Sequence, residues 1–275
     1  MSHTITEYHR PTQIEEALRL LARRDATVVA LGGGTHLIGR HRRDVDAVVD
    51  LRDLGLSYLR REGDVLRIGA TTTLQSLIDA ADLSPAWEGE IARVVERTRA
   101  RNLREAGTVA GTLVAAEHNN PLATLLIAIG ATVAIAPGNE TVALDEFLPD
   151  RSRLMAGSLL TEIVIPLPHP GEAVAFEQVA RTPADLPIVC AAVRAHMADG
   201  AARQVRIGLG GVAAWPLRAG AFEHAIESRL QITGALDAAT ADLDPPSDYL
   251  GSADYRRQMA VVTVMRAVER LRTRR

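Results

Sequence analysis

The sequence predicts an α+β protein built in two parts. In the first part a helix, a strand that runs into a series of glycines and a second strand follow one another, which is typical of an α/β layer with a small parallel sheet. A proline-rich segment, residues 166–171, then interrupts the pattern, because it cannot continue a central strand or a helix. Beyond it, three strand-like runs precede two helices, which predicts a sheet of three antiparallel strands covered by helices.

The first elements are identified by their hydrophobic pattern. Apolar residues on one face predict an amphipathic helix over Thr12–Arg24, and Thr12 with Glu15 fits a capping box. Thr27–Leu31 is a short buried strand, and Asp46–Leu51 is a second one.

The middle of the chain predicts a hairpin followed by helices and further strands. The turn Glu62-Gly63-Asp64 lies between two strand-like runs within residues 58–70. We expect helices near 72–81, 87–99 and 121–129, and strands at 131–136, 141–144 and 161–166.

The second part begins with strands at 173–181, 187–198 and 202–212. The turn Asp199-Gly200 predicts that the last two form a hairpin. Helices are expected near 217–228 and 253–273.

Composition excludes several classes of protein. The chain has 275 residues, a net charge of −3 and no lysine, so no general basic field favours nucleic acid or a membrane surface. No apolar run reaches the roughly 18 residues of a spanning helix, and the N-terminus lacks the pattern of a secretion signal. The one cysteine, Cys190, cannot form an internal disulfide or hold an iron–sulfur cluster. We therefore expect a cytoplasmic protein without a membrane span.

Two small-residue segments are candidates for binding a cofactor. Gly32-Gly33-Gly34-Thr35 follows a strand, where backbone N–H groups can approach phosphate oxygens, although a tight turn explains the same residues. Gly107-Thr108-Val109-Ala110-Gly111-Thr112 has the same character and the same alternative. The residues alone do not select a flavin.

Other reactive side chains offer less. The histidines have no clustered carboxylate or thiol partners, so a metal site is not expected. Cys190 lies in an apolar strand and is expected to be a buried structural thiol. Asp145-Glu146 is expected to begin a solvated helix.

The two loops and their order resemble the FAD-binding medium subunit of molybdenum hydroxylases, the family of aerobic carbon monoxide dehydrogenase and xanthine dehydrogenase. The resemblance extends over nearly the whole chain and rests on seven segments in the family's order. They are residues 8–21, 29–37, 66–74, 107–111, 159–163, 207–213 and 252–257.

This resemblance implies a fold and a cofactor. It implies a PCMH-type FAD-binding domain at residues 1–167, with α/β subdomains at about 1–56 and 57–167, and a C-terminal domain of the family at 168–275. One set of implied FAD contacts would cradle the pyrophosphate through Gly32, Gly33, Gly34, Thr35, His36 and Leu37. Thr108, Ala110, Gly111 and Thr112 would contact FAD from the second subdomain, and Leu160 would pack near the flavin ring.

The resemblance also implies a function. The chain would be an electron-transfer subunit without a catalytic acid or base of its own, taking electrons from an iron–sulfur small subunit to an external acceptor. A large subunit with the molybdenum cofactor would hydroxylate the substrate.

Several positions depart from the family's pattern. His36 stands where Asp, Ser or Glu is usual, Ala110 replaces a Gly and Thr112 an Asn. Pro121 aligns with an expected cofactor-binding Asp, and Gln178 with a common Lys. These departures leave two alternatives open: a flavin-free paralogue that acts as a scaffold or binding protein, and a stand-alone flavoprotein oxidoreductase.

Overall fold

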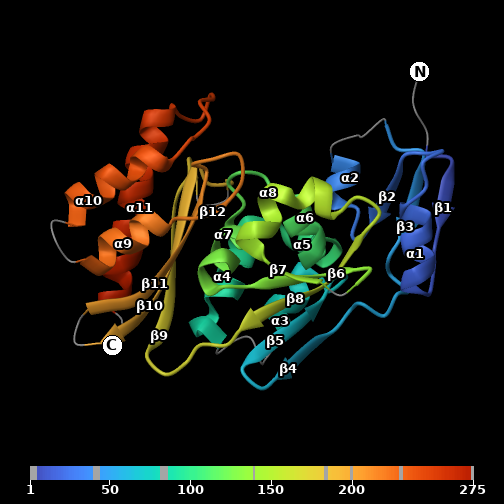
Figure 1. Cartoon of the computed structure of the whole chain (residues 1–275), viewed down its shortest axis with the longest axis horizontal. Helices are drawn as coiled ribbons and strands as arrows, with labels where there is room; N and C mark the ends of the chain where they lie inside the picture. The colour runs from blue at the N-terminus through green and yellow to red at the C-terminus, as the bar shows by residue number, and fades with distance from the viewer. Residues whose placement is uncertain are drawn as a thin grey trace. The chain divides into compact units, whose positions relative to one another are not determined.

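The chain forms two compact units, each assembled from separate stretches of sequence (Figure 1). The computed structural model describes residues 5–39, 44–80, 86–138, 140–182, 185–198, 201–228 and 232–273. The first unit lies within Met1–Asp79, Ala100–Ala115 and Thr132–Ile165, and the second within Ala80–Arg99, Ala116–Ala131 and Pro166–Arg275.

A small parallel sheet begins the first unit. Its strands β1 (Glu7–His9), β2 (Val28–Leu31) and β3 (Ala47–Asp50) lie in the order β1-β3-β2. All four residues of the central strand β3 are buried, as expected of a strand covered on both faces. The predicted parallel sheet is therefore present.

Helix α1 (Ile14–Leu21) starts later than the sequence predicts, and it has no capping box. Its N-cap residue is Gln13, whose side chain makes no capping hydrogen bond. Thr12 lies one residue too early to cap the first turn. The helix instead presents the buried Ala17 inward, so packing of its apolar face stabilises it.

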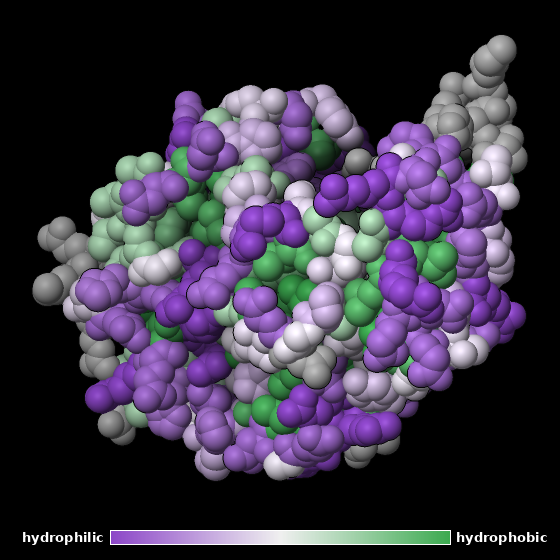
Figure 2. Space-filling model, turned by 45° about the vertical axis from the view of Figure 1, so that its right-hand side comes forward, coloured by the Kyte–Doolittle hydropathy of each residue, from purple (hydrophilic) through white to green (hydrophobic). Residues whose placement is uncertain are grey.

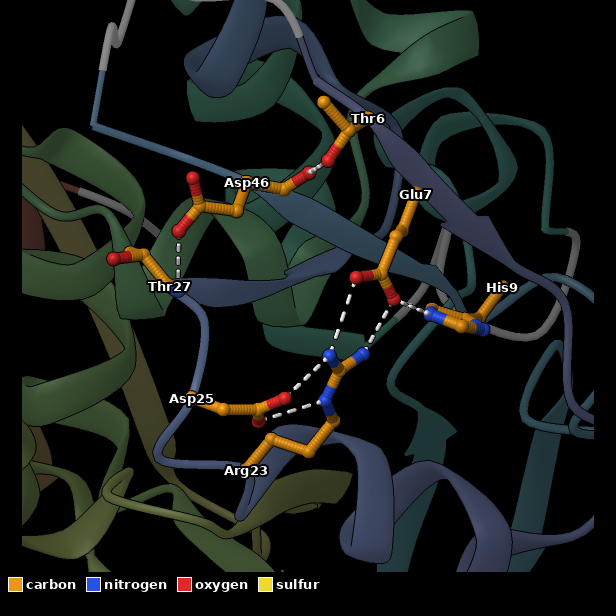
Figure 3. Close-up of polar contacts among 7 residues, drawn as sticks. All are labelled: Thr6, Glu7, His9, Arg23, Asp25, Thr27 and Asp46. Carbon is orange, nitrogen blue, oxygen red and sulfur yellow. Dashed lines mark hydrogen bonds and ion pairs between the residues drawn. The ribbon is translucent and has the colours of Figure 1, made fainter.

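Polar contacts hold the edges of this small sheet together (Figure 3). The backbone N–H of Thr6 donates to the Asp46 carbonyl at 2.8 Å, and that of Thr27 donates to the Asp46 carboxylate at 2.7 Å. The guanidinium of Arg23 binds the carboxylates of Glu7 and Asp25. The short strand β1 is thereby tied to the end of α1.

A larger sheet of five strands completes the first unit, with strand order β4-β5-β8-β6-β7. Its strands are β4 (Leu59–Glu62), β5 (Val65–Gly69), β6 (Thr132–Ala136), β7 (Glu140–Ala143) and β8 (Leu159–Pro166). The helices of this part are α3 (Leu74–Asp79), α5 (Arg101–Ala106), α6 (Val109–Val114) and α8 (Leu144–Leu154). The hairpin within 58–70 is confirmed, as is a helix starting near Asp145-Glu146, whereas α5 and α6 were not predicted.

The second unit is a sheet covered by helices. Strands β9 (Glu172–Val179), β10 (Val189–Ala198) and β11 (Ala201–Gly210) are antiparallel, as predicted, and the two-residue strand β12 (Leu217–Arg218) adds a fourth. The predicted turn Asp199-Gly200 lies outside the described residues. The helices are α4 (Glu90–Thr98), which follows the 3₁₀ turn η1 (Ala86–Gly89), α7 (Pro121–Ile129), α9 (Gly220–Ser228), α10 (Ile232–Ala239) and α11 (Ala253–Thr273), with a further 3₁₀ turn η2 (Thr240–Asp242).

Large apolar residues and glycines alternate along β11, and this alternation explains how helices pack against both faces of the sheet (Figure 1). Ile207 and Leu209 point into the core that α9 and α11 share. The residues between and after them are glycines, and a Cβ on Gly208 would lie only 2.1 Å from the Thr124 carbonyl oxygen of α7. The lack of side chains there lets α7, whose nine residues are all buried, approach the strand closely.

Candidate functional site

The first candidate loop lies at the carboxyl end of the small parallel sheet. It leaves β2 at Leu31, passes through Gly32, Gly33 and Gly34 and enters the five-residue helix α2 (Thr35–Gly39). Gly34 has a φ of +71°, in the left-handed region that favours glycine. Such a change of hand turns successive N–H groups toward one side, the arrangement of an anion-binding nest.

A buried acid lies beside this loop on the neighbouring strand. Asp50 pairs in register with Leu31 and is fully buried. Burial alone would raise the pKa of Asp50, but hydrogen bonds from the Tyr8 hydroxyl and from the N–H of Arg52 hold that pKa below its ordinary value. The carboxylate of Asp50 is therefore ionised and hydrogen-bonded to Tyr8 and Arg52, and these bonds stabilise the edge of the sheet.

The second candidate loop is a sharp connection between two helices. The N–H of Gly107 donates to the Leu103 carbonyl at 2.8 Å and ends α5. Thr108 then caps α6, because its Oγ1 accepts from the N–H of Gly111 at 3.1 Å. The Thr112 hydroxyl donates back to the Thr108 carbonyl at 2.9 Å. The hydroxyls of Thr108 and Thr112 therefore both hydrogen-bond to the backbone at the start of α6.

The two loops pack directly against each other. A Cβ on Gly33 would lie 1.6 Å from the carbonyl oxygen of Ala106, and one on Gly32 would lie 2.9 Å from Oγ1 of Thr108. No side chain fits in so little space, which explains the glycines at 32 and 33. The structure thus brings together the two segments that the sequence singled out.

Backbone N–H groups on both loops remain available for a ligand. The N–H groups of Gly107, Val109 and Gly111 have acceptors within the protein. In the part of the chain that the structure describes, six other N–H groups of the two loops have none, as is usual at the start of a helix. They belong to Gly32, Gly33, Gly34, Thr35, Thr108 and Ala110. A concentration of unused donors without a carboxylate among them suits phosphate oxygens, so these residues fit the pyrophosphate of a dinucleotide.

The side chains of the remaining predicted FAD contacts are buried or half-buried. Ala110 and Thr112 are buried at 7% and 9% exposure, so their side chains pack inward. His36 and Leu37 are half-buried on α2. Leu160 is buried on β8, where the carbonyl of the next residue, Thr161, accepts from the N–H of Ala70.

Two of the departures from the family's pattern lie in the second unit. Pro121 begins α7, and the side chain of Asn120 caps that helix by accepting from the N–H of Ala123 at 3.0 Å. Proline is well suited to the first position of a helix, so Pro121 has a structural explanation. Gln178 lies on β9 and pairs with Cys190.

The structure also adds residues that the sequence analysis missed. The Ala106 carbonyl shapes the contact between the loops, and Gln75 binds Arg104 across 29 residues of sequence. No local pattern could have shown these contacts. Among the described residues, there is no group of three or more metal-ligating side chains and no helix long and apolar enough to cross a membrane.

Comparison with known proteins assigns both parts of the chain. Residues 3–168 match the family described as "FAD binding domain in molybdopterin dehydrogenase". Residues 174–271 match the "CO dehydrogenase flavoprotein C-terminal domain". The chain belongs to the family of FAD-binding medium subunits of molybdenum hydroxylases.

Individual relatives of this medium subunit agree over its whole length. The carbon monoxide dehydrogenase medium chain of Afipia carboxidovorans is 32% identical over 98% of this chain and 97% of its own. The glyceraldehyde dehydrogenase medium chain of Sulfolobus acidocaldarius is 28% identical over 94% and 96%. A crystal structure of Cu,Mo-CO dehydrogenase contains a chain that superposes with a TM-score of 0.88 at 31% identity, with 100% of both chains covered. The predicted family, fold and FAD cofactor are confirmed.

Proposed function

We propose that this medium subunit binds one FAD through the two loops and passes electrons from an iron–sulfur partner subunit to an external acceptor. When bound, the flavin supplies chemistry that can take up electrons singly and release them in pairs. The protein's own part is to hold and orient the cofactor. In this proposal the N–H groups of Gly33, Gly34 and Thr35 hold the pyrophosphate on one side, and the N–H of Ala110 holds it on the other.

The observation that carries the proposal is the contact between the two loops. Their unused N–H groups lie on segments that touch at Gly33 and Ala106, although these residues are far apart in sequence. Such a site exists before the ligand arrives, so little ordering entropy opposes binding. Because the donors are backbone groups, the replacements at His36, Ala110 and Thr112 leave them in place.

The need for partners follows from the chain's own chemistry. Its single cysteine is fully buried and burial raises the pKa of that thiol to about 12, so Cys190 cannot contribute to an iron–sulfur cluster. Hydrophilic residues cover most of the face in Figure 2, with separate hydrophobic patches among them.

The first experiment is an absorption spectrum of the purified subunit, followed by titration of flavin-depleted protein with FAD. We expect a flavin spectrum and saturable quenching of FAD fluorescence with one FAD per chain. A colourless protein that does not respond to FAD would contradict the proposal and favour the flavin-free paralogue.

A matched pair of variants tests whether the first loop is the nest. Gly34→Ala forces a side chain into the left-handed region, at a cost of about 1–2 kcal/mol, and it displaces the N–H groups on either side. Gly55→Ala is the control, because Gly55 has the same φ of +71° and open space around its Cα. We expect Gly34→Ala to weaken FAD binding by about tenfold or more, which corresponds to about 1.4 kcal/mol. Equal FAD affinity in the two variants would mean that the first loop is an ordinary turn.

Partner subunits are tested by native purification from the source cell with mass spectrometry. We expect two further chains, one rich in cysteine and one large. A yellow protein that is recovered alone and is reduced by a small substrate would support a stand-alone flavoprotein instead.

A further inference from the structure

The second loop is held by the segment that connects β5 to α3. The N–H of Leu74 donates to the Gly107 carbonyl at 2.8 Å, and the N–H of Val109 donates to the Thr72 carbonyl at 2.9 Å. These bonds make a short β-bridge between Thr73 and Thr108. Residues 72–75 therefore form a seat for the loop, and we call this segment the loop seat.

A side-chain hydrogen bond extends the loop seat to helix α5. Gln75 is 8% exposed, and its Oε1 accepts from Nε of Arg104 at 3.0 Å. The other end of the amide is also used, because Nε2 donates to Asp79 at 2.9 Å. Both ends of the Gln75 amide are engaged, so its orientation is determined.

The position of α5 determines how the two loops fit. Its last residue, Ala106, contributes the carbonyl that lies where a Cβ on Gly33 would be. The backbone bonds of the loop seat fix the chain from Gly107 onward, but they do not fix the turn of α5 before it. Arg104 lies in that turn, so its bond to Gln75 adds a side-chain constraint between the loop seat and α5.

We infer that Gln75 is a positioning residue for the cofactor site: through Arg104 it holds the Ala106 carbonyl against Gly33, and so keeps the N–H donors of both loops converged. This inference rests on the proposed function. The side-chain hydrogen bonds of Gln75 go to Arg104 and Asp79 rather than to the donors of the loops. It acts by fixing the helix that carries one side of the site.

The test compares two substitutions at Gln75 with a control substitution on helix α5. Gln75→Met keeps the length of the side chain and removes the acceptor for Arg104. Gln75→Glu is made together with Asp79→Asn: the pair keeps an acceptor for Arg104, and the new amide at position 79 can donate to the new carboxylate, because Asp79 now accepts from Gln75 and two facing carboxylates would repel each other. Arg101→Gln is the control, since Arg101 pairs with Glu105 on the exposed side of α5 at 74% and 54% exposure.

Three quantities are measured in each variant at a temperature well below unfolding: the Kd for FAD, hydrogen exchange of the amides in residues 33–35 and 108–110, and the melting temperature. We expect Gln75→Met to raise the Kd by about fivefold or more and to speed exchange at both loops, because a hydrogen bond to a charged group is lost. The double variant Gln75→Glu with Asp79→Asn, and the control Arg101→Gln, should stay within about twofold of wild type.

Each contrary result has a distinct meaning. If Gln75→Met lowers only the melting temperature and leaves both FAD affinity and loop exchange unchanged, Gln75 is merely structural and the inference is overturned. Equal losses in Gln75→Met and in the double variant Gln75→Glu with Asp79→Asn, which keeps an acceptor for Arg104, would show that the bond to Arg104 is not the cause and would overturn the inference. A wild-type chain that binds no FAD overturns the proposed function and this inference together.

Discussion

Gly33 is the position at which loop packing and ligand binding can be separated most clearly. In Gly33→Ala the new Cβ would begin 1.6 Å from the Ala106 carbonyl oxygen, whereas real Cβ contacts essentially never fall under 3.0 Å. The backbone of one loop must therefore retreat by more than 1 Å. The obstacle is a carbonyl rather than the end of a flexible side chain, so the strain cannot be relieved by a rotamer change.

The size of the effect follows from this overlap. Overpacking of a well-packed site costs about 1–3 kcal/mol, and a backbone obstacle places Gly33→Ala at about 2–3 kcal/mol. For a chain of this size that corresponds to a fall in melting temperature of about 4–12 °C. We expect this fall in the flavin-depleted protein as well, because the contact involves no ligand.

The assay is thermal unfolding of flavin-depleted Gly33→Ala beside Gly34→Ala, whose Cβ would meet only the flexible ends of Leu31 and Ile38 at 3.3 Å or more. Gly33→Ala should be the less stable variant without FAD. If it melts like wild type and has lost only FAD binding, the glycine serves ligand approach, and the contact between the loops is not what requires it.

Three further predictions concern the rest of the chain. Arg256 is fully buried and bonds to the carboxylate of Asp248 at 2.8 Å. Asp248→Ala should therefore destabilise the protein by about 2–3 kcal/mol, the low end for a broken buried pair, because Asp248 is 30% exposed. In urea unfolding, the double variant with Arg256→Met should be less destabilised than the sum of the two single effects, and strict additivity would refute the pairing. Cys190, with a pKa of about 12 from burial, should resist a thiol reagent in the native protein and react fully only after unfolding, and fast native labelling would show that it is accessible. Hydrogen bonds from Arg23 and His9 lower the pKa of Glu7 to about 2, so this carboxylate contributes stability that is complete above its ordinary pKa of 4.5 and is lost as pH falls through about 2. The difference in melting temperature between wild type and Glu7→Gln should shrink steadily over that window, and a difference that is undiminished at pH 2 would refute the assignment.

Local patterns in the sequence determined most of the strands and the longer helices. The hairpin around Gly63, the glycine-bounded strand β2 and the long helix α11 all follow from periodicity and turn residues, which act over a few neighbours. The order of seven short motifs was enough to identify the family and its cofactor. Helix α6 was missed because its glycine and β-branched residues carry little helix signal. Helix α5 is composed mostly of good helix formers, but its six residues are too few to show a helical period.

Only the tertiary structure decided which distant segments meet. α4 and α7 belong with a sheet whose strands begin after Pro166, and nothing local to the glycines of β11 shows that α7 packs on them. The candidate loops were found by composition, but the reason for Gly33 is a carbonyl 73 residues away in the chain. Thr112 stays a predicted FAD contact, but only the structure shows that its hydroxyl donates to the backbone of Thr108. A local sequence pattern reflects the backbone hydrogen bonds and the apolar face of one segment. Close packing instead depends on a partner surface that exists only once the chain has folded.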